Sequence, residues 1–230
     1  MRVFTLTPIS EDAPKRSRFF FYSLICWSFF VNESDIHPIT DRLISRGLKE
    51  KLLGQKGVVF WLYGLSGSGK STLAIEMENR LHQENIHSVV LDGDNLRSGL
   101  NSDLGFSNQD RAENIRRVSE IAKLFSTNGI ITLVSLISPL REFRNKAKSI
   151  IGEDHFHEIF IKASYSTCKE RDVKGLYAKA EKGMVQSFTG QDSEFEEPET
   201  DCLMIDSENE NLQQSADLLY KYIRQAISLT

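Results

Sequence analysis

The chain has 230 residues, of which 28 are lysine or arginine and 32 are aspartate or glutamate, so its formal net charge is −4. This mild acidity argues against a protein whose main partner is nucleic acid, because such proteins usually present a basic surface. Hydrophobic residues make up 40% of the sequence and charged residues 26%, which excludes wholesale disorder. Cys26, Cys168 and Cys202 lie far apart and form no C-x-x-C pair, so we expect a reducing compartment, the cytoplasm.

Residues 1–35 are predicted to be an N-terminal extension of unknown role, and 36–230 to be the main domain. The apolar run at 19–31 has about 13 residues, whereas a membrane-spanning helix needs roughly 20, so no transmembrane span is expected. Basic residues precede this run as in a signal peptide, but no small-x-small cleavage site follows it. Three interpretations of this N-terminal stretch stay open. It is a segment packed on the domain or on a partner, or a tail outside the fold that can result from a start codon placed too early, or a targeting or membrane-surface segment.

Strands alternate with helices along the rest of the chain. The predicted elements are helix 40–53, strand 58–63, helix 69–83, strand 88–92, helix 108–128, strand 130–137, strand 158–163, strand 202–206 and helix 210–227. The continuous apolar run at 58–63 is typical of a strand buried on both faces of a parallel sheet. The alternation predicts an α/β fold with right-handed crossovers. Residues 165–200 are rich in charge, glycine and serine, and we interpret them as a lid or loop region.

The first predicted strand runs directly into a phosphate loop, residues 64–71, which fits the pattern G-x-x-x-x-G-K-[ST]. Its glycines allow backbone N–H groups to turn towards an anion, and the following helix adds a favourable dipole. Lys70 is expected to reach the β- and γ-phosphates, and the Ser71 hydroxyl to bind Mg²⁺. The predicted nucleotide-binding residues of this loop are Gly64, Leu65, Ser66, Gly67, Ser68, Gly69, Lys70, Ser71 and Thr72.

Two acids, Asp92 and Asp94, follow the second predicted strand. In an open α/β sheet the ligand lies at this carboxyl edge, where an acid can support Mg²⁺ or accept a proton from an attacking hydroxyl. A plain Asp-Gly turn is the alternative. We assign both acids to catalysis and Asp92 also to the metal, and we leave open which of them accepts the proton. Residues 145–148 have Lys where a guanine-specific GTPase needs Asp, so guanine specificity is not supported.

A basic and polar cluster follows the acids. Arg111 and Asn114 are three residues apart and share a helix face, which Arg117 can extend. Arg97 and Phe106 precede this helix in the sequence. The planar guanidinium suits sulfate and phosphate oxygens, and an aromatic ring can stack on a base. The alternative is a solvated helix with internal ion pairs, which we prefer for Arg116.

Seven segments carry a family resemblance: 64–72, 92–101, 103–107, 110–117, 137–139, 171–177 and 188–190. In their residues, order and spacing, the chain resembles the adenylylsulfate kinase (APS kinase) family from about Gly54 to the C-terminus. The blocks Asp-Gly-Asp-Asn at 92–95 and Lys-Gly-Leu-Tyr at 174–177 are far more specific than the phosphate loop. Glu194-Phe195 departs from the Pro-Tyr that is common in the family.

The resemblance implies a reaction: transfer of the γ-phosphate of ATP to the 3′-hydroxyl of adenylyl sulfate, giving 3′-phosphoadenylyl sulfate and ADP. It implies a three-layer P-loop NTPase fold with a mainly parallel five-stranded sheet and a lid segment, together with ATP, Mg²⁺ and usually a homodimer. We expect the chain to be too short for a sulfate adenylyltransferase domain, so a separate protein should supply adenylyl sulfate.

The resemblance also implies roles for single residues. The adenylyl sulfate pocket is expected to contain Asp94, Arg97, Phe106, Arg111, Asn114, Ile137, Lys174, Gly175, Leu176 and Phe188, with the adenine between the two phenylalanines. Ser138 matches the position assigned as a phosphoserine intermediate. Direct in-line transfer, with the Ser138 hydroxyl satisfying backbone at a strand end, is the alternative. Arg171 is predicted to reach the nucleotide phosphates from a lid at 165–185.

Two other functions stay open. The chain can be another small-molecule P-loop kinase, acting on a nucleotide or a sugar, although the blocks at 174–177 and 188–190 argue against this. It can also be a non-catalytic nucleotide-binding module that regulates a sulfurylase partner, although every catalytic motif is intact. A panel of acceptors tests the first alternative. ATP binding without turnover would favour the second.

Overall fold

The structure is a computed structural model that describes residues 36–183, 189–190, 194–199 and 202–228. The chain divides into two compact units, 1–43 and 44–230. The described part of the first unit carries a short 3₁₀ helix, η2 (Thr40–Arg42). All strands described below belong to the second unit. Within the described ranges, no helix has both the length and the apolar character needed to cross a bilayer.

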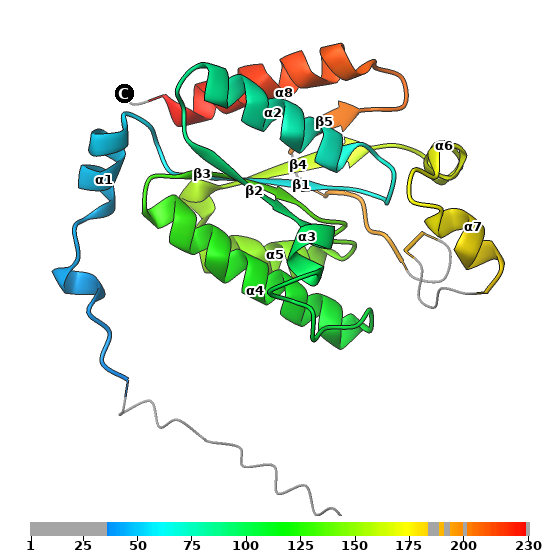
Figure 1. Cartoon of the computed structure of the whole chain (residues 1–230), viewed down its shortest axis with the longest axis horizontal. Helices are drawn as coiled ribbons and strands as arrows, with labels where there is room; N and C mark the ends of the chain where they lie inside the picture. Colours follow the sequence, from blue (N-terminus) through cyan, green and yellow to red (C-terminus); the bar gives the residue numbers. More distant parts are fainter. Residues whose placement is uncertain (1–35, 184–188, 191–193, 200–201, 229–230) are drawn as a thin grey trace, which may run out of the picture. The chain divides into compact units, whose positions relative to one another are not determined.

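A five-stranded parallel sheet forms the centre of the second unit (Figure 1). Its strands are β1 (Val59–Tyr63), β2 (Ser88–Asp92), β3 (Ile131–Ser135), β4 (Phe156–Lys162) and β5 (Leu203–Asp206). Their spatial order is β2-β3-β1-β4-β5, and every neighbouring pair is parallel. The central strand β1 is buried along its whole length, as its unbroken apolar run predicts. The predicted five-stranded parallel sheet is confirmed.

Helices cover both faces of this sheet (Figure 1). One face carries α2 (Lys70–Gln83) and α8 (Leu212–Ile227), and the other carries α4 (Asn108–Thr127) and α5 (Arg141–Ile151). Alternate residues of β1 serve the two layers, because successive strand side chains point to opposite faces. Phe60 and Leu62 pack in the core beside α2 and α8, whereas Trp61 and Tyr63 pack in the core beside α4 and α5. The result is the predicted three-layer architecture.

The predicted helix 40–53 is wrong as one element. The structure has η2 and then α1 (Arg46–Leu53), and Leu43 and Ser45 between them have extended backbone. The apolar residues that suggested a continuous helix find no core: the side chains of Leu48 and Leu52 are 61% and 85% exposed. Tertiary packing of an apolar face supplies most helix stability in proteins, and that support is missing here.

Several helices were not predicted. They are α3 (Gly93–Arg97), α5, η3 (Glu153–His155), α6 (Tyr165–Arg171) and α7 (Leu176–Glu181). The last two lie within 165–200, so the interpretation of that stretch as loop is corrected in part. The helix α5 does have a helical signal, since Phe143, Ala147 and Ile151 are buried at a spacing of four. This helical period was missed in the sequence because most residues between the three buried positions are charged or polar.

Candidate functional site

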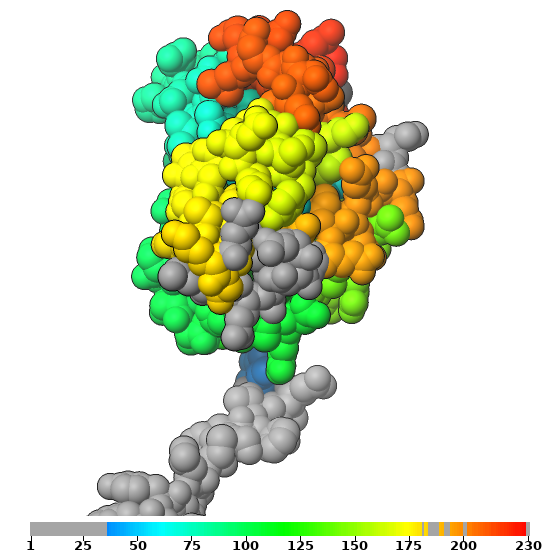
Figure 2. Space-filling view, turned by 90° about the vertical axis from the view of Figure 1, so that its right-hand side faces the viewer, coloured from blue at the N-terminus to red at the C-terminus, as the bar shows by residue number. Residues whose placement is uncertain are grey.

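A cavity of about 720 Å³ lies at the carboxyl edge of the sheet. It is lined by the phosphate loop and the start of α2, by the ends of β2 and β3, and by the loop between α6 and α7. In the view from the side of α6 and α7, the yellow part of the chain that includes these two helices occupies the middle of the face (Figure 2). A volume of this size suits a small organic ligand, and the carboxyl edge is where open α/β sheets bind theirs.

The phosphate loop connects β1 to α2 in a conformation that requires glycine. Gly64, Gly67 and Gly69 have φ values of 150°, 81° and 97°. A Cβ atom on Gly64 would lie 2.4 Å from the carbonyl oxygen of Ile161, so a larger residue does not fit there. The loop delivers Lys70 as the first residue of α2, whose N-terminus faces the cavity.

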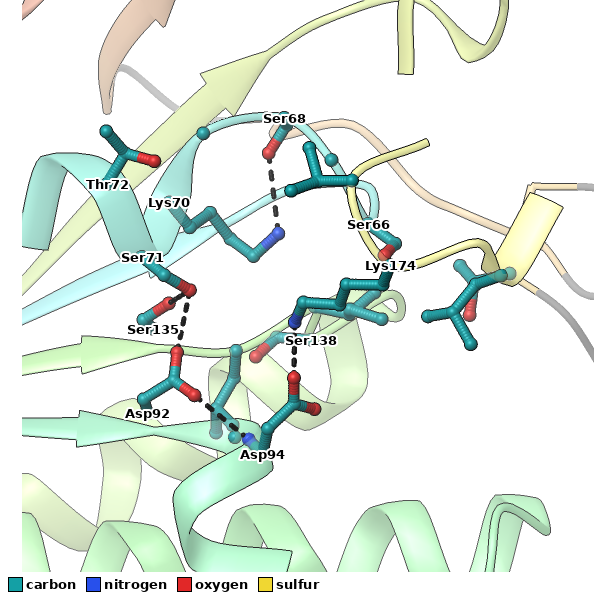
Figure 3. A pocket seen from close by; sticks show the side chains of 18 of the residues that line it. Ser66, Ser68, Lys70, Ser71, Thr72, Asp92, Asp94, Ser135, Ser138 and Lys174 are labelled. Carbon is teal, nitrogen blue, oxygen red and sulfur yellow. Dashed lines mark hydrogen bonds and ion pairs between the residues drawn. The ribbon is translucent and has the colours of Figure 1, made fainter. Parts of the chain in front are cut away.

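Lys70 is a buried cation held by its own loop (Figure 3). Its Nζ donates to the carbonyl oxygen of Leu65 at 2.7 Å and to Ser68 Oγ at 3.4 Å. Burial lowers the pKa of Lys70 to about 8, because the charged form loses hydration. An anion beside this ammonium would favour its charged form, so the site is electrostatically suited to phosphate.

Oxygen atoms of Ser71, Asp92 and Ser135 gather beside Lys70 (Figure 3). Ser71 Oγ donates to Asp92 Oδ2 at 2.7 Å and lies 3.2 Å from Ser135 Oγ. Burial by itself would raise the pKa of Asp92, but hydrogen bonds from Ser71 and from the backbone N–H of Asp94 outweigh it and lower the pKa. The carboxylate is therefore ionised at neutral pH. An ionised carboxylate with two hydroxyls is a donor set that fits a hard cation such as Mg²⁺.

Asp94 and Lys174 form an ion pair between opposite walls of the cavity (Figure 3). Asp94 belongs to α3, and Lys174 lies in the loop between α6 and α7. The two residues are 80 positions apart in sequence. Both side chains keep substantial exposure, 68% for Asp94 and 49% for Lys174, so water and ligands can reach the pair.

The basic cluster lines the same cavity from α3, α4 and the loop between them. The Arg97 guanidinium stacks over the Phe106 ring at 4.4 Å and donates to the carbonyl oxygen of Gly105 at 2.8 Å. Arg111 Nη1 donates to Thr189 Oγ1 at 2.6 Å. Burial lowers the pKa of both arginines, which stay charged at neutral pH. Asn114 is 5% exposed, and its Oδ1 accepts a 2.9 Å hydrogen bond from Asn101.

Ser138 is buried and has a left-handed backbone, with 2% exposure and φ of 43°. Its Oγ accepts a 2.9 Å hydrogen bond from Trp61 Nε1. The partner of this hydroxyl is thus an indole of the central strand. Backbone was the alternative partner expected of this hydroxyl from the sequence, so the observed indole partner differs from that expectation.

The structure brings most of the predicted site residues to one cavity. Those that line it are Ser66, Gly67, Ser68, Gly69, Lys70, Ser71, Thr72, Asp92, Asp94, Arg97, Phe106, Arg111, Asn114, Ile137, Ser138, Arg171, Lys174 and Leu176. Arg171 donates to the carbonyl oxygen of Ser207 at 2.6 Å. Gly64, Leu65 and Gly175 are described but lie outside this lining. Phe188 lies outside the described residues, so its stacking role stays a prediction.

Other lining residues escaped the sequence analysis. Ser135 ends β3 at the same carboxyl edge as Asp92, but the predicted strand 130–137 placed it inside the strand instead of at its end. Thr189 lies inside the family block 188–190 but was not singled out. Ser207, directly after β5, and Ser215 of α8 also line the cavity, and no local pattern marks them.

The parallel sheet, the phosphate loop before α2 and the acids at the strand ends define a P-loop kinase. The family model for adenylylsulphate kinase matches residues 56–206. Adenylyl-sulfate kinases from Phocaeicola vulgatus and Bacteroides thetaiotaomicron are 50% and 49% identical to the chain, over 84% and 83% of its length and 95% of theirs. The chain belongs to the adenylylsulphate kinase family.

A solved structure agrees with this assignment. The APS kinase CysC of Mycobacterium tuberculosis, in complex with AMPPNP and APS, is 45% identical to this chain. The superposition has a TM-score of 0.67 and covers 71% of this chain and 98% of that one.

Proposed function

We propose that the chain transfers the γ-phosphate of ATP to the 3′-hydroxyl of adenylyl sulfate, giving 3′-phosphoadenylyl sulfate and ADP. One observation carries this proposal beyond family membership. A single cavity holds the phosphate loop with Lys70 and the basic cluster with Arg111. A donor nucleotide and an anionic acceptor nucleotide then share one cavity, which is what phosphoryl transfer by positioning requires.

On the donor side, Lys70 binds the β- and γ-phosphates and stabilises the charge that develops during transfer. Ser71 and Asp92 would hold Mg²⁺, with Ser135 in support, because the three side chains form the hydrogen-bonded group described above. The bound metal would neutralise phosphate charge. Arg171, which already lies on the phosphate loop side of the cavity, adds a further cation.

On the acceptor side, Arg97, Arg111 and Asn114 bind adenylyl sulfate, and Phe106 stacks on its adenine. Asp94 is the better candidate for the proton acceptor, because the Asp92 carboxylate is already engaged by Ser71 and by the backbone of Asp94. Lys174 orients Asp94 through their ion pair. The segment α6–α7 closes over both substrates and excludes water.

Ser138 is proposed to act without becoming phosphorylated. Its hydroxyl is buried and accepts from Trp61, so it is poorly placed to attack a phosphate. Direct transfer between the two nucleotides needs no covalent step on the protein.

The test is ADP release from purified protein with Mg-ATP, with and without adenylyl sulfate, beside a Lys70→Ala variant. ADP release that depends on adenylyl sulfate and is lost in the variant supports the proposal. Preference for another nucleotide or a sugar would identify a different small-molecule kinase. ATP binding without turnover of any acceptor would identify a non-catalytic module.

The surroundings of the enzyme are also proposals. We propose a homodimer in the cytoplasm, a kinase domain from about residue 36, and a separate sulfate adenylyltransferase that supplies the acceptor. The thiols of Cys168 and Cys202 are both free, which suits a reducing compartment. Mass measurement in solution tests the dimer, and deletion of residues 1–35 with activity retained tests the domain boundary.

A further inference from the structure

Arg144 is a buried arginine to which neither the motifs nor the proposed mechanism assigns a role. It lies in α5 and is 2% exposed. Burying a guanidinium costs several kcal/mol unless its charge and its N–H groups are all matched, on the order of the desolvation penalty for an ion. Its partners therefore indicate what the fold uses it for.

Three segments of the chain meet at the Arg144 guanidinium. Nε donates to Glu158 Oε1 of β4 at 2.9 Å, and Nη1 donates to the carbonyl oxygen of Ser138 at 3.0 Å. Nη2 donates to the carbonyl oxygen of Glu196 at 3.0 Å. The plane of the group also lies over the Tyr63 ring of β1, 4.4 Å from its centroid. The side chain thus ties two irregular segments to two strands of the sheet.

The first irregular segment is the pocket loop, residues 137–139, and all three of its residues line the cavity. Its middle residue, Ser138, has the left-handed backbone conformation that L-residues other than glycine rarely adopt, with φ of 43°. Such a conformation persists only where surrounding contacts hold it. Trp61 holds the side chain of Ser138, and Arg144 holds its carbonyl oxygen.

The second irregular segment, 194–199, is bound to the same pocket loop. The backbone N–H of Glu196 donates to the carbonyl oxygen of Pro139 at 2.8 Å, and Glu196 Oε2 accepts from the backbone N–H of Arg141 at 2.6 Å. This segment follows Thr189, which contacts Arg111 of the acceptor site. Arg144 therefore joins the pocket loop to the chain that returns from the acceptor wall.

We propose that Arg144 is a positioning residue for the acceptor pocket. Glu158 holds the Arg144 guanidinium, and the guanidinium in turn fixes the pocket loop 137–139 and the returning segment 194–199. This inference rests on the proposed function, because the acceptor is adenylyl sulfate. Arg144 is not among the residues that line the cavity, so it acts through the backbone it holds. Lys70 and Ser71, by contrast, bond to Leu65, Asp92 and Ser135, none of which bonds to Arg144. The phosphate loop meets the pocket loop through one long backbone bond, from the N–H of Gly64 to the carbonyl oxygen of Ile137 at 3.4 Å.

The proposal separates the two substrates. Loss of the guanidinium group of Arg144 should weaken the binding of adenylyl sulfate and leave the binding of ATP almost unchanged. Arg144→Lys keeps the charge but cannot donate to three acceptors in one plane. We expect it to raise KM for adenylyl sulfate about tenfold and to change KM for ATP less than about twofold, as expected of a displaced pocket wall.

A double variant separates positioning from mere stability. Arg144→Met leaves Glu158 without its cation, and Arg144→Met with Glu158→Gln removes both charges. Removing the second charge should recover thermal stability relative to the single variant. Both variants lack the hydrogen bond from residue 144 to the carbonyl oxygen of Ser138 in the pocket loop. Affinity for adenylyl sulfate in the presence of ADP should therefore stay about tenfold weaker in both than in the unmodified protein.

Arg80→Met is the matched control. Arg80 also pairs with carboxylates, Glu76 and Asp217, and lies over a tyrosine ring, but it belongs to α2 on the opposite face of the sheet. It should leave both KM values unchanged.

The decisive experiment measures KM for each substrate, binding of adenylyl sulfate by calorimetry and thermal unfolding in these variants. The proposal is overturned if Arg144→Lys changes neither KM, if both KM values rise together, or if the double variant recovers affinity along with stability. Should Arg144→Met fail to fold, Arg144→Lys still decides. Absence of acceptor-dependent activity in the unmodified protein would instead count against the proposed function.

Discussion

The ammonium of Lys70 donates a 2.7 Å hydrogen bond to the carbonyl oxygen of Leu65, five residues earlier in the same loop. The loop therefore keeps its own cation folded into it, shielded from water and close to the backbone N–H groups that face the cavity. A phosphate entering the loop exchanges a neutral carbonyl for an anion as the partner of Lys70. The energetic consequences of that exchange can be measured.

ATP binding should take up protons near pH 8. Burial lowers the pKa of Lys70 to about 8 without a phosphate, and phosphate anions raise it. At pH 8 about half of the Lys70 side chains are neutral, so binding should draw up to about half a proton per site. Calorimetry of ATP binding in buffers with different ionisation enthalpies measures this uptake. It should disappear in Lys70→Met and persist in a Lys123→Met control, which changes an exposed lysine of α4.

Lys70 should also make stability depend on pH. The unfolded chain holds the Lys70 proton up to about pH 10.5, whereas the folded protein releases it near pH 8. The unfolded state then binds more protons between these values, so the contribution of Lys70 to folding becomes more favourable as pH rises through this window. Lys70→Met should therefore be more stable than the unmodified protein at pH 7, with an advantage that shrinks above pH 8. Equal advantages at pH 7 and pH 10 in urea unfolding would contradict the burial of a charged Lys70.

Asp92→Asn should raise the Mg²⁺ concentration that gives half-maximal activity. The substitution removes a carboxylate that hydrogen bonds from Ser71 and the backbone N–H of Asp94 keep ionised. Mg²⁺ prefers charged oxygen ligands, so its binding should weaken. We expect at least a tenfold rise, on the order of 1.4 kcal/mol or more in metal binding. Activity titrated with Mg²⁺ measures it. Asp217→Asn, at an exposed carboxylate of α8, is the control and should leave the titration unchanged.

Thr189→Val should weaken the binding of adenylyl sulfate by about tenfold or somewhat more. Its hydroxyl accepts from Arg111 at 2.6 Å, and hydrogen bonds to charged groups contribute about 1.5 kcal/mol or somewhat more. The variant keeps the shape of the side chain and leaves the guanidinium less well oriented. Separate KM measurements for ATP and adenylyl sulfate test this. A change in KM for ATP alone would mean that Thr189 acts on the ATP site and not on the adenylyl sulfate site.

Ser138→Ala and Ser138→Gly distinguish a structural serine from a phosphorylated one. Both should retain kcat within a few-fold. Ser138→Ala leaves the buried indole N–H of Trp61 unpaired, which should cost about 1–3 kcal/mol of stability. Ser138→Gly loses the same bond but relieves a left-handed backbone, recovering on the order of 1 kcal/mol. Loss of kcat in a folded Ser138→Ala protein, or phosphate on Ser138 by mass spectrometry, would establish a covalent step.

Local sequence patterns predicted much of the fold. The apolar run of β1 and the phosphate loop are readable because each depends on residues next to one another in the chain. The same holds for the long helix α4, whose buried residues Ile115, Val118 and Ala122 repeat at a helical spacing. The single helix predicted at 40–53 was wrong, because periodic apolar residues do not reveal whether a core covers them. The apolar face of α1 stays largely exposed.

The candidate site was predicted where motifs carried it. Lys70, Asp92 and Arg111 were found in the chain by their residue type and spacing, and tertiary structure then placed them around one cavity. Ser135 and Ser207 were missed because a serine at a strand end carries no periodic or compositional signal. Only the parallel alignment of the strands brings them to the same edge.

What the sequence by itself determined was the chemistry: a loop for phosphate, acids at a strand end and arginines for a second anion. What only the tertiary structure decided was how that chemistry is held. Arg144 is one charge among many in a polar stretch of sequence, and nothing local shows that it is buried against Glu158, Ser138 and Glu196. The reason is physical: the free energy of a buried charge depends on its partners. Glu158 and Glu196 are 14 and 52 residues from Arg144 in the sequence, and only folding brings them into contact with it.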